Sequence, residues 1–242
     1  MEELVNLLKM TQDELKGFLY EYLKKIDMNP LLKDGFLYAE GDIPIMLVAH
    51  LDTVAEEPPT NLCYSKTLDL IYNRDGILGG DDRCGVYAIM KLLEKYRPFI
   101  LFTEDEEIGG YGAGDAIRQL DKPKVKYIIE FDRNGVNDCV FYDCGNKKFM
   151  KYVEKFGFIT KQGTFSDISI LGPEWDIATV NLSCGYFNEH TKKEIVFFNA
   201  LENVIKKAEK MIDKIDKAPY FDYQDKMFKQ FDVKVKRIGG KK

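Results

Sequence analysis

The sequence predicts an α/β protein of three layers, in which a mainly parallel mixed sheet is covered by helices on both faces. Residues 45–49 and 99–103 are almost wholly apolar and have the length of strands, which is typical of strands buried on both faces. Strand-like and helix-like segments also alternate along the chain, as they do around parallel sheets. With 242 residues, 45% of them hydrophobic, the chain can bury one large core. We therefore expect one domain over residues 1–216 and a tail, 217–242, to which the sequence assigns no role.

Helices open the predicted fold, because apolar side chains before Pro30 are spaced three and four residues apart. Thr11 followed by Glu14 is typical of a capping box, so the second helix should begin there. Strands are expected at residues 36–39, 43–49, 68–72 and 98–103, with a surface loop over 55–66. Between the last two strands, a helix should run from Asp81 to about Tyr96.

The remaining elements follow the same two patterns. Helical spacing predicts helices at residues 112–120, 147–156 and 194–214. Apolar runs predict strands at residues 125–131, 139–142 and 175–182. The closing helix has one apolar stripe and should pack on the sheet.

Composition argues against several classes of function. The net charge is −5, from 35 basic and 40 acidic residues, and the two signs are interspersed. Neither a nucleic-acid surface nor a membrane surface is therefore indicated. No apolar run approaches the roughly 20 residues of a membrane-spanning helix, and the acidic start Met1-Glu2-Glu3 does not read as a signal peptide. We expect a cytoplasmic protein without nucleic-acid or membrane partners.

Acids and histidines gather where predicted strands end or helices begin. The clusters are His50-Leu51-Asp52, Gly80-Asp81-Asp82, Glu104-Asp105-Glu106-Glu107, Asp132-Arg133 and Asn188-Glu189-His190. The chain has only two histidines, and both belong to these clusters. Because the carboxyl ends of parallel strands meet at one rim of a sheet, we expect these groups to converge.

Each cluster alone also has a plain structural interpretation. Asp81 and Asp82 could cap a helix, His50 could be a hydrogen-bonded turn residue, and the four acids at 104–107 could form a solvated loop. Together, however, two imidazoles and three or more carboxylates are more than the four ligands of a structural zinc. Such a set suits two metal ions that share a bridging carboxylate. Asp52 can then hydrogen-bond His50 and fix its tautomer.

The order of these clusters resembles that of the co-catalytic di-zinc exopeptidases, the superfamily of peptidase T, the glutamate carboxypeptidases and the bacterial leucyl aminopeptidases. The motifs are His-x-Asp, Gly-x-Asp-Asp-x-x-Gly, Asp-Glu-Glu-x-Gly, Asp and His-Thr-x-x-Glu, within about residues 1–215. Segments 77–85 and 102–109 are nearest to peptidase T. The resemblance implies the zinc exopeptidase (phosphorylase/hydrolase-like) fold. It also implies a metal-binding hydrolase that cleaves peptides with a water bridging two zinc ions.

The resemblance further implies a role for each site residue. The metal ligands would be His50, Asp81, Glu107, Asp132 and His190. Asp81 would bridge the two divalent ions, His50 and Asp132 would complete one site, and Glu107 and His190 the other. Asp52 would orient His50, and Glu106 would be the general base. Arg133 and Tyr186 are candidate substrate contacts.

One feature departs from peptidase T and the carboxypeptidases, which carry an inserted lid or dimerisation domain between the Asp and the final His. Here Asp132 and His190 are only 58 positions apart (190 − 132), so we expect a single catalytic domain without a lid. The predicted function is a metallopeptidase, an aminopeptidase acting on short peptides. An N-acyl amino acid amidohydrolase or a carboxypeptidase is an alternative for the same site, and a non-catalytic binding module is an alternative of another class. The chain could also form a homo-oligomer.

Overall fold

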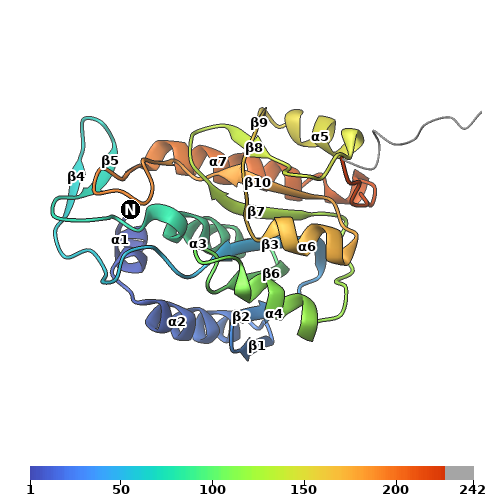
Figure 1. Cartoon of the computed structure of the whole chain (residues 1–242), viewed down its shortest axis with the longest axis horizontal. Helices are drawn as coiled ribbons and strands as arrows, with labels where there is room; N and C mark the ends of the chain where they lie inside the picture. The colour runs from blue at the N-terminus through green and yellow to red at the C-terminus, as the bar shows by residue number, and fades with distance from the viewer. Residues whose placement is uncertain (227–242) are drawn as a thin grey trace, which may run out of the picture.

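A mixed eight-stranded sheet forms the centre of the protein in a computed structural model, which describes residues 1–226 (Figure 1). Its strand order is β1-β2-β6-β3-β7-β10-β8-β9. The strands are β1 (Pro30–Lys33), β2 (Phe36–Ala39), β3 (Ile43–His50), β6 (Pro98–Thr103), β7 (Ile128–Arg133), β8 (Asp138–Val140), β9 (Ile159–Lys161) and β10 (Thr179–Ser183). The four central strands, β6, β3, β7 and β10, are parallel to one another. The predicted α/β fold with a mixed sheet is confirmed.

Helices cover both faces of this sheet (Figure 1). One core lies under α1 (Glu2–Leu8), α2 (Gln12–Lys25), α3 (Gly80–Leu93), α5 (Lys147–Glu154) and α7 (Phe198–Ile212). The other lies under α4 (Tyr111–Gln119) and α6 (Ile168–Trp175). Strand β3 supplies both cores, because Leu47 and Ala49 belong to the first while Met46 and Val48 belong to the second. This alternation of side chains is that of a strand buried on both faces.

A second, four-stranded antiparallel sheet lies beside the first, in the order β11-β12-β5-β4. Its strands are β4 (Leu62–Ser65), β5 (Leu70–Asn73), β11 (Tyr186–Phe187) and β12 (Ile195–Phe197). The start of α3 packs closely on it: a side chain added at Gly80 would come within 2.7 Å of Val196. This sheet therefore joins two segments that are far apart in the sequence.

Most expected elements form where the sequence predicts them, and three expectations are wrong. The expected capping box of Thr11 and Glu14 is present. Residues 62–65 form β4 instead of a loop, because they pair with β5 as a hairpin. Trp175 ends helix α6 instead of opening a strand, since a short apolar run suits either structure. Residues 195–197, for which the sequence predicts a helix, form strand β12 and pair with β5. This pairing overrides the helical pattern until α7 begins at Phe198.

The first part of the expected tail lies against the domain. A short 3-10 helix, η1, covers Ile215–Lys217. Beyond it, the backbone of Phe221 accepts a hydrogen bond from the Ala178 N–H and donates one to Lys126, and its ring is buried. Residues 227–242 of the tail lie outside the described residues.

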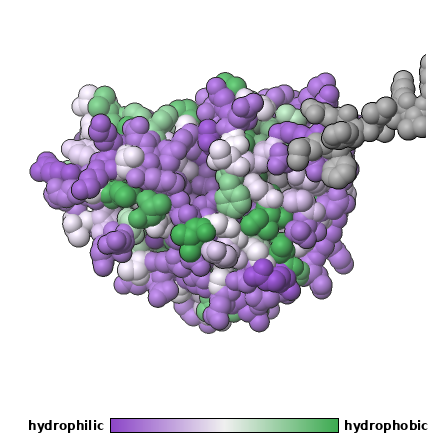
Figure 2. All heavy atoms as spheres, in the orientation of Figure 1, coloured by the Kyte–Doolittle hydropathy of each residue, from purple (hydrophilic) through white to green (hydrophobic). Residues whose placement is uncertain are grey.

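Hydrophilic residues dominate the face of the molecule seen in Figure 2, and apolar side chains occur there in small groups. Among residues 1–226, no helix combines the length and the apolar character needed to cross a membrane.

Candidate metal centre

The predicted site residues come together at one edge of the central sheet. His50 ends β3, and Asp132 lies in the neighbouring strand β7. Glu106 and Glu107 lie in the loop that follows β6, which pairs with the other side of β3. Asp81 comes from the start of α3, and His190 from the turn between β11 and β12. The convergence expected from the strand order is therefore present.

Two groups of three ligand atoms share Asp81. His50, Asp81 and Asp132 form one group, and Asp81, Glu107 and His190 form the other, with all atoms of a group within 4.8 Å of one another. The two carboxylate oxygens of Asp81 divide between the groups: Oδ1 lies 3.1 Å from Nε2 of His50, and Oδ2 lies 3.1 Å from Nε2 of His190. Asp81 thus has the arrangement that a bridging ligand requires.

The adjacent acids Asp81 and Asp82 have different environments. Asp81 faces the two histidines, whereas Asp82 is fully buried and accepts hydrogen bonds from the backbone N–H groups of His50 and Gly85. The backbone of Asp81 and Asp82 is not helical, so the regular part of α3 begins after Asp82, and the bond from Gly85, three residues on, is that of a helix N-cap. The capping interpretation therefore holds for Asp82. A Cβ at Gly85 would lie 2.0 Å from the carbonyl oxygen of Phe131, so glycine there lets α3 approach the strand that carries Asp132.

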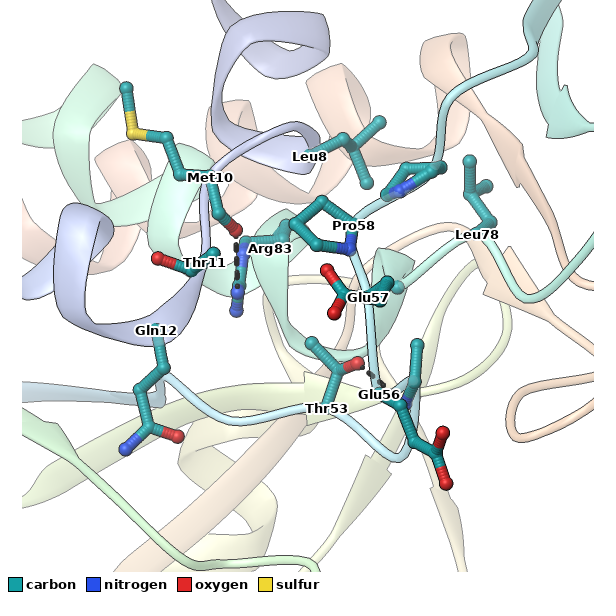
Figure 3. A pocket seen from close by; sticks show the side chains of 13 residues that line it. Leu8, Met10, Thr11, Gln12, Thr53, Glu56, Glu57, Pro58, Leu78 and Arg83 are labelled. Carbon is teal, nitrogen blue, oxygen red and sulfur yellow. Dashed lines mark hydrogen bonds between the residues drawn. The ribbon is translucent and has the colours of Figure 1, made fainter.

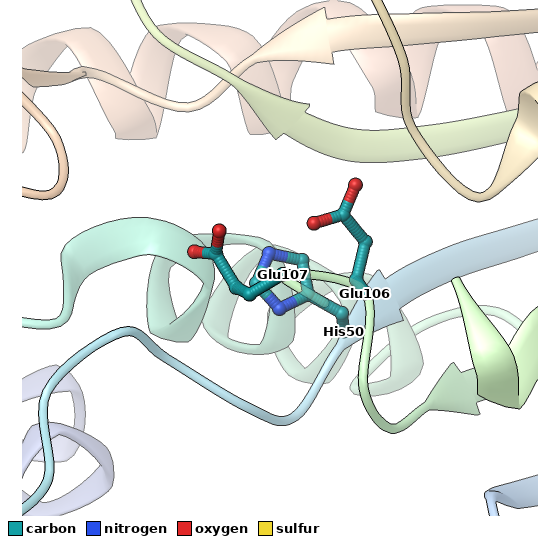
Figure 4. A group of neighbouring side chains, drawn as sticks. All are labelled: His50, Glu106 and Glu107. Carbon is teal, nitrogen blue, oxygen red and sulfur yellow. The ribbon is translucent and has the colours of Figure 1, made fainter. Parts of the chain in front are cut away.

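The run of four acids after β6 also divides. Glu104 forms an ion pair with Lys16 at 2.5 Å and accepts a hydrogen bond from the Gly35 N–H. Glu106 and Glu107 instead point toward the site, and their carboxylates diverge on either side of the His50 ring (Figure 4). These two residues and His50 form a third group within ligand distance, so both glutamates lie close enough to act on one centre.

Asp52 links the histidine to the acid loop. Its Oδ1 lies 3.2 Å from Nδ1 of His50 and accepts a bond from the Glu106 N–H, and its Oδ2 accepts one from the Glu107 N–H. Burial opposes the charged form of this carboxyl, but the hydrogen bonds outweigh burial and lower the pKa of Asp52. An ionised Asp52 can hold the imidazole in one orientation and tautomer.

Two buried residues hold Asp132 in place. The Asn181 side-chain amide accepts from the Asp132 N–H at 2.9 Å and donates to its carboxylate at 3.2 Å. The Tyr186 hydroxyl donates to the other carboxylate oxygen at 3.1 Å. Arg133, the next residue, has a buried Nε without a hydrogen-bond partner among the described residues. The two predicted substrate contacts, Tyr186 and Arg133, thus both adjoin a candidate ligand.

Glu194 is a further site residue, which ends the motif His-Thr-x-x-Glu but receives no role from the sequence. Its buried carboxylate accepts hydrogen bonds from the N–H groups of Leu78, Gly79 and Asp81, at 3.0, 2.8 and 3.1 Å. It therefore holds the loop that carries Asp81. Its place four residues after His190 in the motif was the available signal.

The electrostatics of the site call for a cation. Burial and neighbouring carboxylates raise the pKa of Glu106 to about 9, of Glu107 to about 7 and of Asp132 to about 6. Hydrogen bonding to Asp81 raises the pKa of His190 to about 9. Asp81 is the exception, since bonds to both histidines outweigh burial and lower its pKa. Crowded carboxylates of this kind are stabilised when cations share them, so the donor set fits divalent metal ions.

A pocket of about 160 Å³ opens onto these groups, and its wall includes the ligand candidates Asp81, Glu107, Asp132 and His190. A pocket of about 220 Å³ lies elsewhere, around Arg83, whose guanidinium donates to the carbonyl of Met10 (Figure 3). None of the ligand candidates lines that second pocket. Ligand chemistry, and not size, therefore identifies the candidate site.

Comparison with known proteins finds similarity in solved structures alone: no family model and no curated protein matches the chain. Aminopeptidase PepT from Bacillus cereus ATCC 10987 is 16% identical with a TM-score of 0.66, over 90% of this chain and 97% of that one. A tripeptidase from Staphylococcus aureus subsp. aureus Mu50 is 14% identical with a TM-score of 0.72, over 88% and 97%. A TET aminopeptidase from Thaumarchaeota archaeon SCGC AB-539-E09 is 11% identical with a TM-score of 0.71, over 88% and 97%. At these identities the similarity establishes a shared fold.

Proposed function

We propose that this protein is a metal-dependent exopeptidase of the co-catalytic di-zinc superfamily, an aminopeptidase acting on short peptides. The observation that carries the proposal is the pair of ligand groups that share Asp81 at the rim of the sheet. The fold shared with aminopeptidase and tripeptidase structures supports it.

Two divalent ions, which we expect to be zinc, fit the donor atoms present. His50 and Asp132 would hold one ion, Glu107 and His190 the other, and Asp81 both. Imidazole and carboxylate donors suit zinc but also accept manganese or cobalt. When bound, the ions would polarise the scissile carbonyl and lower the pKa of the attacking water.

The chain itself supplies the proton transfers. Glu106 is the general base, because its carboxylate lies beside the ligand groups and belongs to neither of the two that share Asp81. It takes a proton from the attacking water and delivers it to the leaving amine. Asp52 keeps His50 oriented and, through the backbone of Glu106 and Glu107, holds the acid loop.

The substrate class and the oligomeric state are further parts of the proposal. N-acyl amino acids or peptides cleaved from the carboxyl end are alternative substrates for the same site, and Arg133 would recognise a substrate carboxylate, whose geometry matches a guanidinium. A homo-oligomer also stays a prediction, and a structurally similar protein, PhTET1-12s, is a dodecamer.

The test replaces the general base. Glu106→Gln keeps the size of the side chain but cannot accept a proton, so turnover of leucine p-nitroanilide should fall by about 10²–10⁴ while the metal content stays at wild-type level. Glu174→Gln is the matched control, because Glu174 is exposed on α6. Full activity of Glu106→Gln would reassign the base, with Glu107 as the next candidate. A metal-loaded wild type that hydrolyses no aminoacyl, acyl or peptide substrate would support the non-catalytic binding module.

A further inference from the structure

Glu189 is a carboxylate in the wall of the metal pocket that the metal scheme leaves without a role. It lines the pocket together with Asp81, Glu107 and His190, yet it belongs to none of the three ligand groups among residues 1–226. The Asn134 side-chain amide donates a hydrogen bond to its Oε1. Asn134 also lines the pocket, so the carboxylate is held in position by a neutral partner.

The backbone around Glu189 is strained in a way that presents two adjacent side chains to the pocket. Asn188 and His190, on either side of it, have φ angles of 56° and 61°. Asn adopts this left-handed conformation readily, whereas it costs His190 about 1 kcal/mol or more, and such residues cluster at functional sites. The turn is closed by a bond of 2.7 Å from the Thr191 hydroxyl to the Asn188 carbonyl. As a result, Glu189 lines the pocket beside the candidate ligand His190.

The loop that carries Asn134 is hydrogen-bonded to the start of strand β11, which precedes Glu189. The Gly135 N–H donates to the carbonyl of Tyr186 at 3.0 Å, and the Gly185 N–H donates to the carbonyl of Gly135 at 2.9 Å. The two segments that carry Asn134 and Glu189 are therefore fixed relative to each other, which pre-organises the carboxylate for a ligand.

Glu189 forms no ion pair within the described residues, although Arg133 lines the same pocket. A half-buried carboxylate that faces a pocket without a cationic partner is complementary to an ammonium group. In an aminopeptidase substrate the α-nitrogen is two bonds from the scissile carbonyl carbon, so the group that binds the ammonium must lie close to the metal ligands. Glu189 meets this condition, because it lines the same pocket as Asp81, Glu107 and His190.

We propose that Glu189, positioned by Asn134, binds the free α-ammonium group of the substrate and makes the enzyme selective for unblocked N-termini. This inference rests on the proposed exopeptidase function and chooses among its substrate classes. An N-acyl group removes the positive charge of the substrate's α-nitrogen. N-acylated substrates would therefore lose the ion pair with Glu189.

The test compares two inhibitors that differ by one ammonium group. Leucine hydroxamate and its desamino analogue, 4-methylpentanoyl hydroxamate, share the metal-binding group and the side chain. Their affinities for the metal-loaded protein are measured by titration calorimetry, so the readout does not depend on turnover. Glu189→Gln should weaken leucine hydroxamate by about 10- to 100-fold, the range of a hydrogen bond to a charged group, and should change the desamino analogue by less than about twofold. Asn134→Ala should give a smaller loss in the same direction, and Glu174→Gln none.

The outcomes separate the two proposals. Equal affinities of wild type and Glu189→Gln for leucine hydroxamate would overturn the role of Glu189, and so would an equal loss for both inhibitors, since the variant would then have damaged the metal site. If wild type shows the expected preference for the ammonium but cleaves no peptide, the inference on Glu189 stands and the proposed exopeptidase function fails.

Discussion

Replacing Glu194 should unfold the protein at a markedly lower temperature, although Glu194 is not a metal ligand in the proposed scheme. In Glu194→Ala, the N–H groups of Leu78, Gly79 and Asp81 lose their acceptor. A buried donor without a partner costs about 1–3 kcal/mol. In the wild type these three hydrogen bonds stabilise the folded state. Burial raises the pKa of Glu194 to about 7, so the cost of ionising this carboxyl near neutral pH offsets part of that stabilisation. We therefore expect a net loss of about 3–5 kcal/mol in the free energy of unfolding.

A loss of this size corresponds to a fall in Tm of about 6–20 °C for a chain of this length. It should be measured by calorimetry and urea unfolding in the presence of a chelator, so that metal release does not contribute. Glu202→Ala is the matched control, because Glu202 accepts one bond from Tyr87 and its loss should cost about 1 kcal/mol. A Glu194→Ala protein within 1 kcal/mol of wild type would refute the argument that this carboxylate holds the Asp81 loop.

Three further predictions concern the metal site. Asp81→Ala should lose both ions, whereas His50→Ala should mainly weaken one; elemental analysis that finds one tightly bound ion in wild type contradicts the scheme. If Arg133 recognises a substrate carboxylate, Arg133→Ala should slow cleavage only of substrates with a carboxylate next to the scissile bond. If Arg133 acts in the transition state, the variant should lower kcat equally for a neutral aminoacyl amide. No loss of activity on either substrate would place Arg133 outside the site. In chelator, Tm should fall as the pH rises from about 5 to 9. The reason is that burial raises the carboxyl pKa of Glu106 to about 9 and of Glu107 to about 7. A carboxyl whose pKa is raised by folding stabilises the folded state at a pH below its unfolded pKa, and this stability is lost as the pH rises through its folded pKa. Added zinc should reduce this fall, and a flat profile in chelator would contradict it.

The parts of the site that the sequence predicts are those at the ends of long, apolar strands. His50 and the pair Glu106 and Glu107 follow buried strands β3 and β6, and their convergence follows from the parallel order of those strands. Asp132 is reached by the same argument, although β7 extends through it to Arg133. Long apolar runs are strong patterns, so their placement is robust.

The residues to which the sequence assigns no role depend on short strands and on distant pairing. Glu194 and Glu189 are placed by β11 and β12, which have only two and three residues, too few for a pattern. Asn181 lies within an apolar strand, and its contact with Asp132 follows from the pairing of β10 with β7. Such contacts are set by tertiary structure, and local preference carries little information about them.

The place of Asp81 between His50 and His190 has one more consequence, because these two histidines come from different sheets. His50 and Asp132 belong to the large sheet, and His190 to the turn of the small one. Divalent ions bound there would cross-link segments that are far apart in the chain, and their binding energy would stabilise the folded state by mass action. Removing them would therefore lower the free energy of unfolding. If the proposed ions bind, metal occupancy would then be measurable as a rise in Tm.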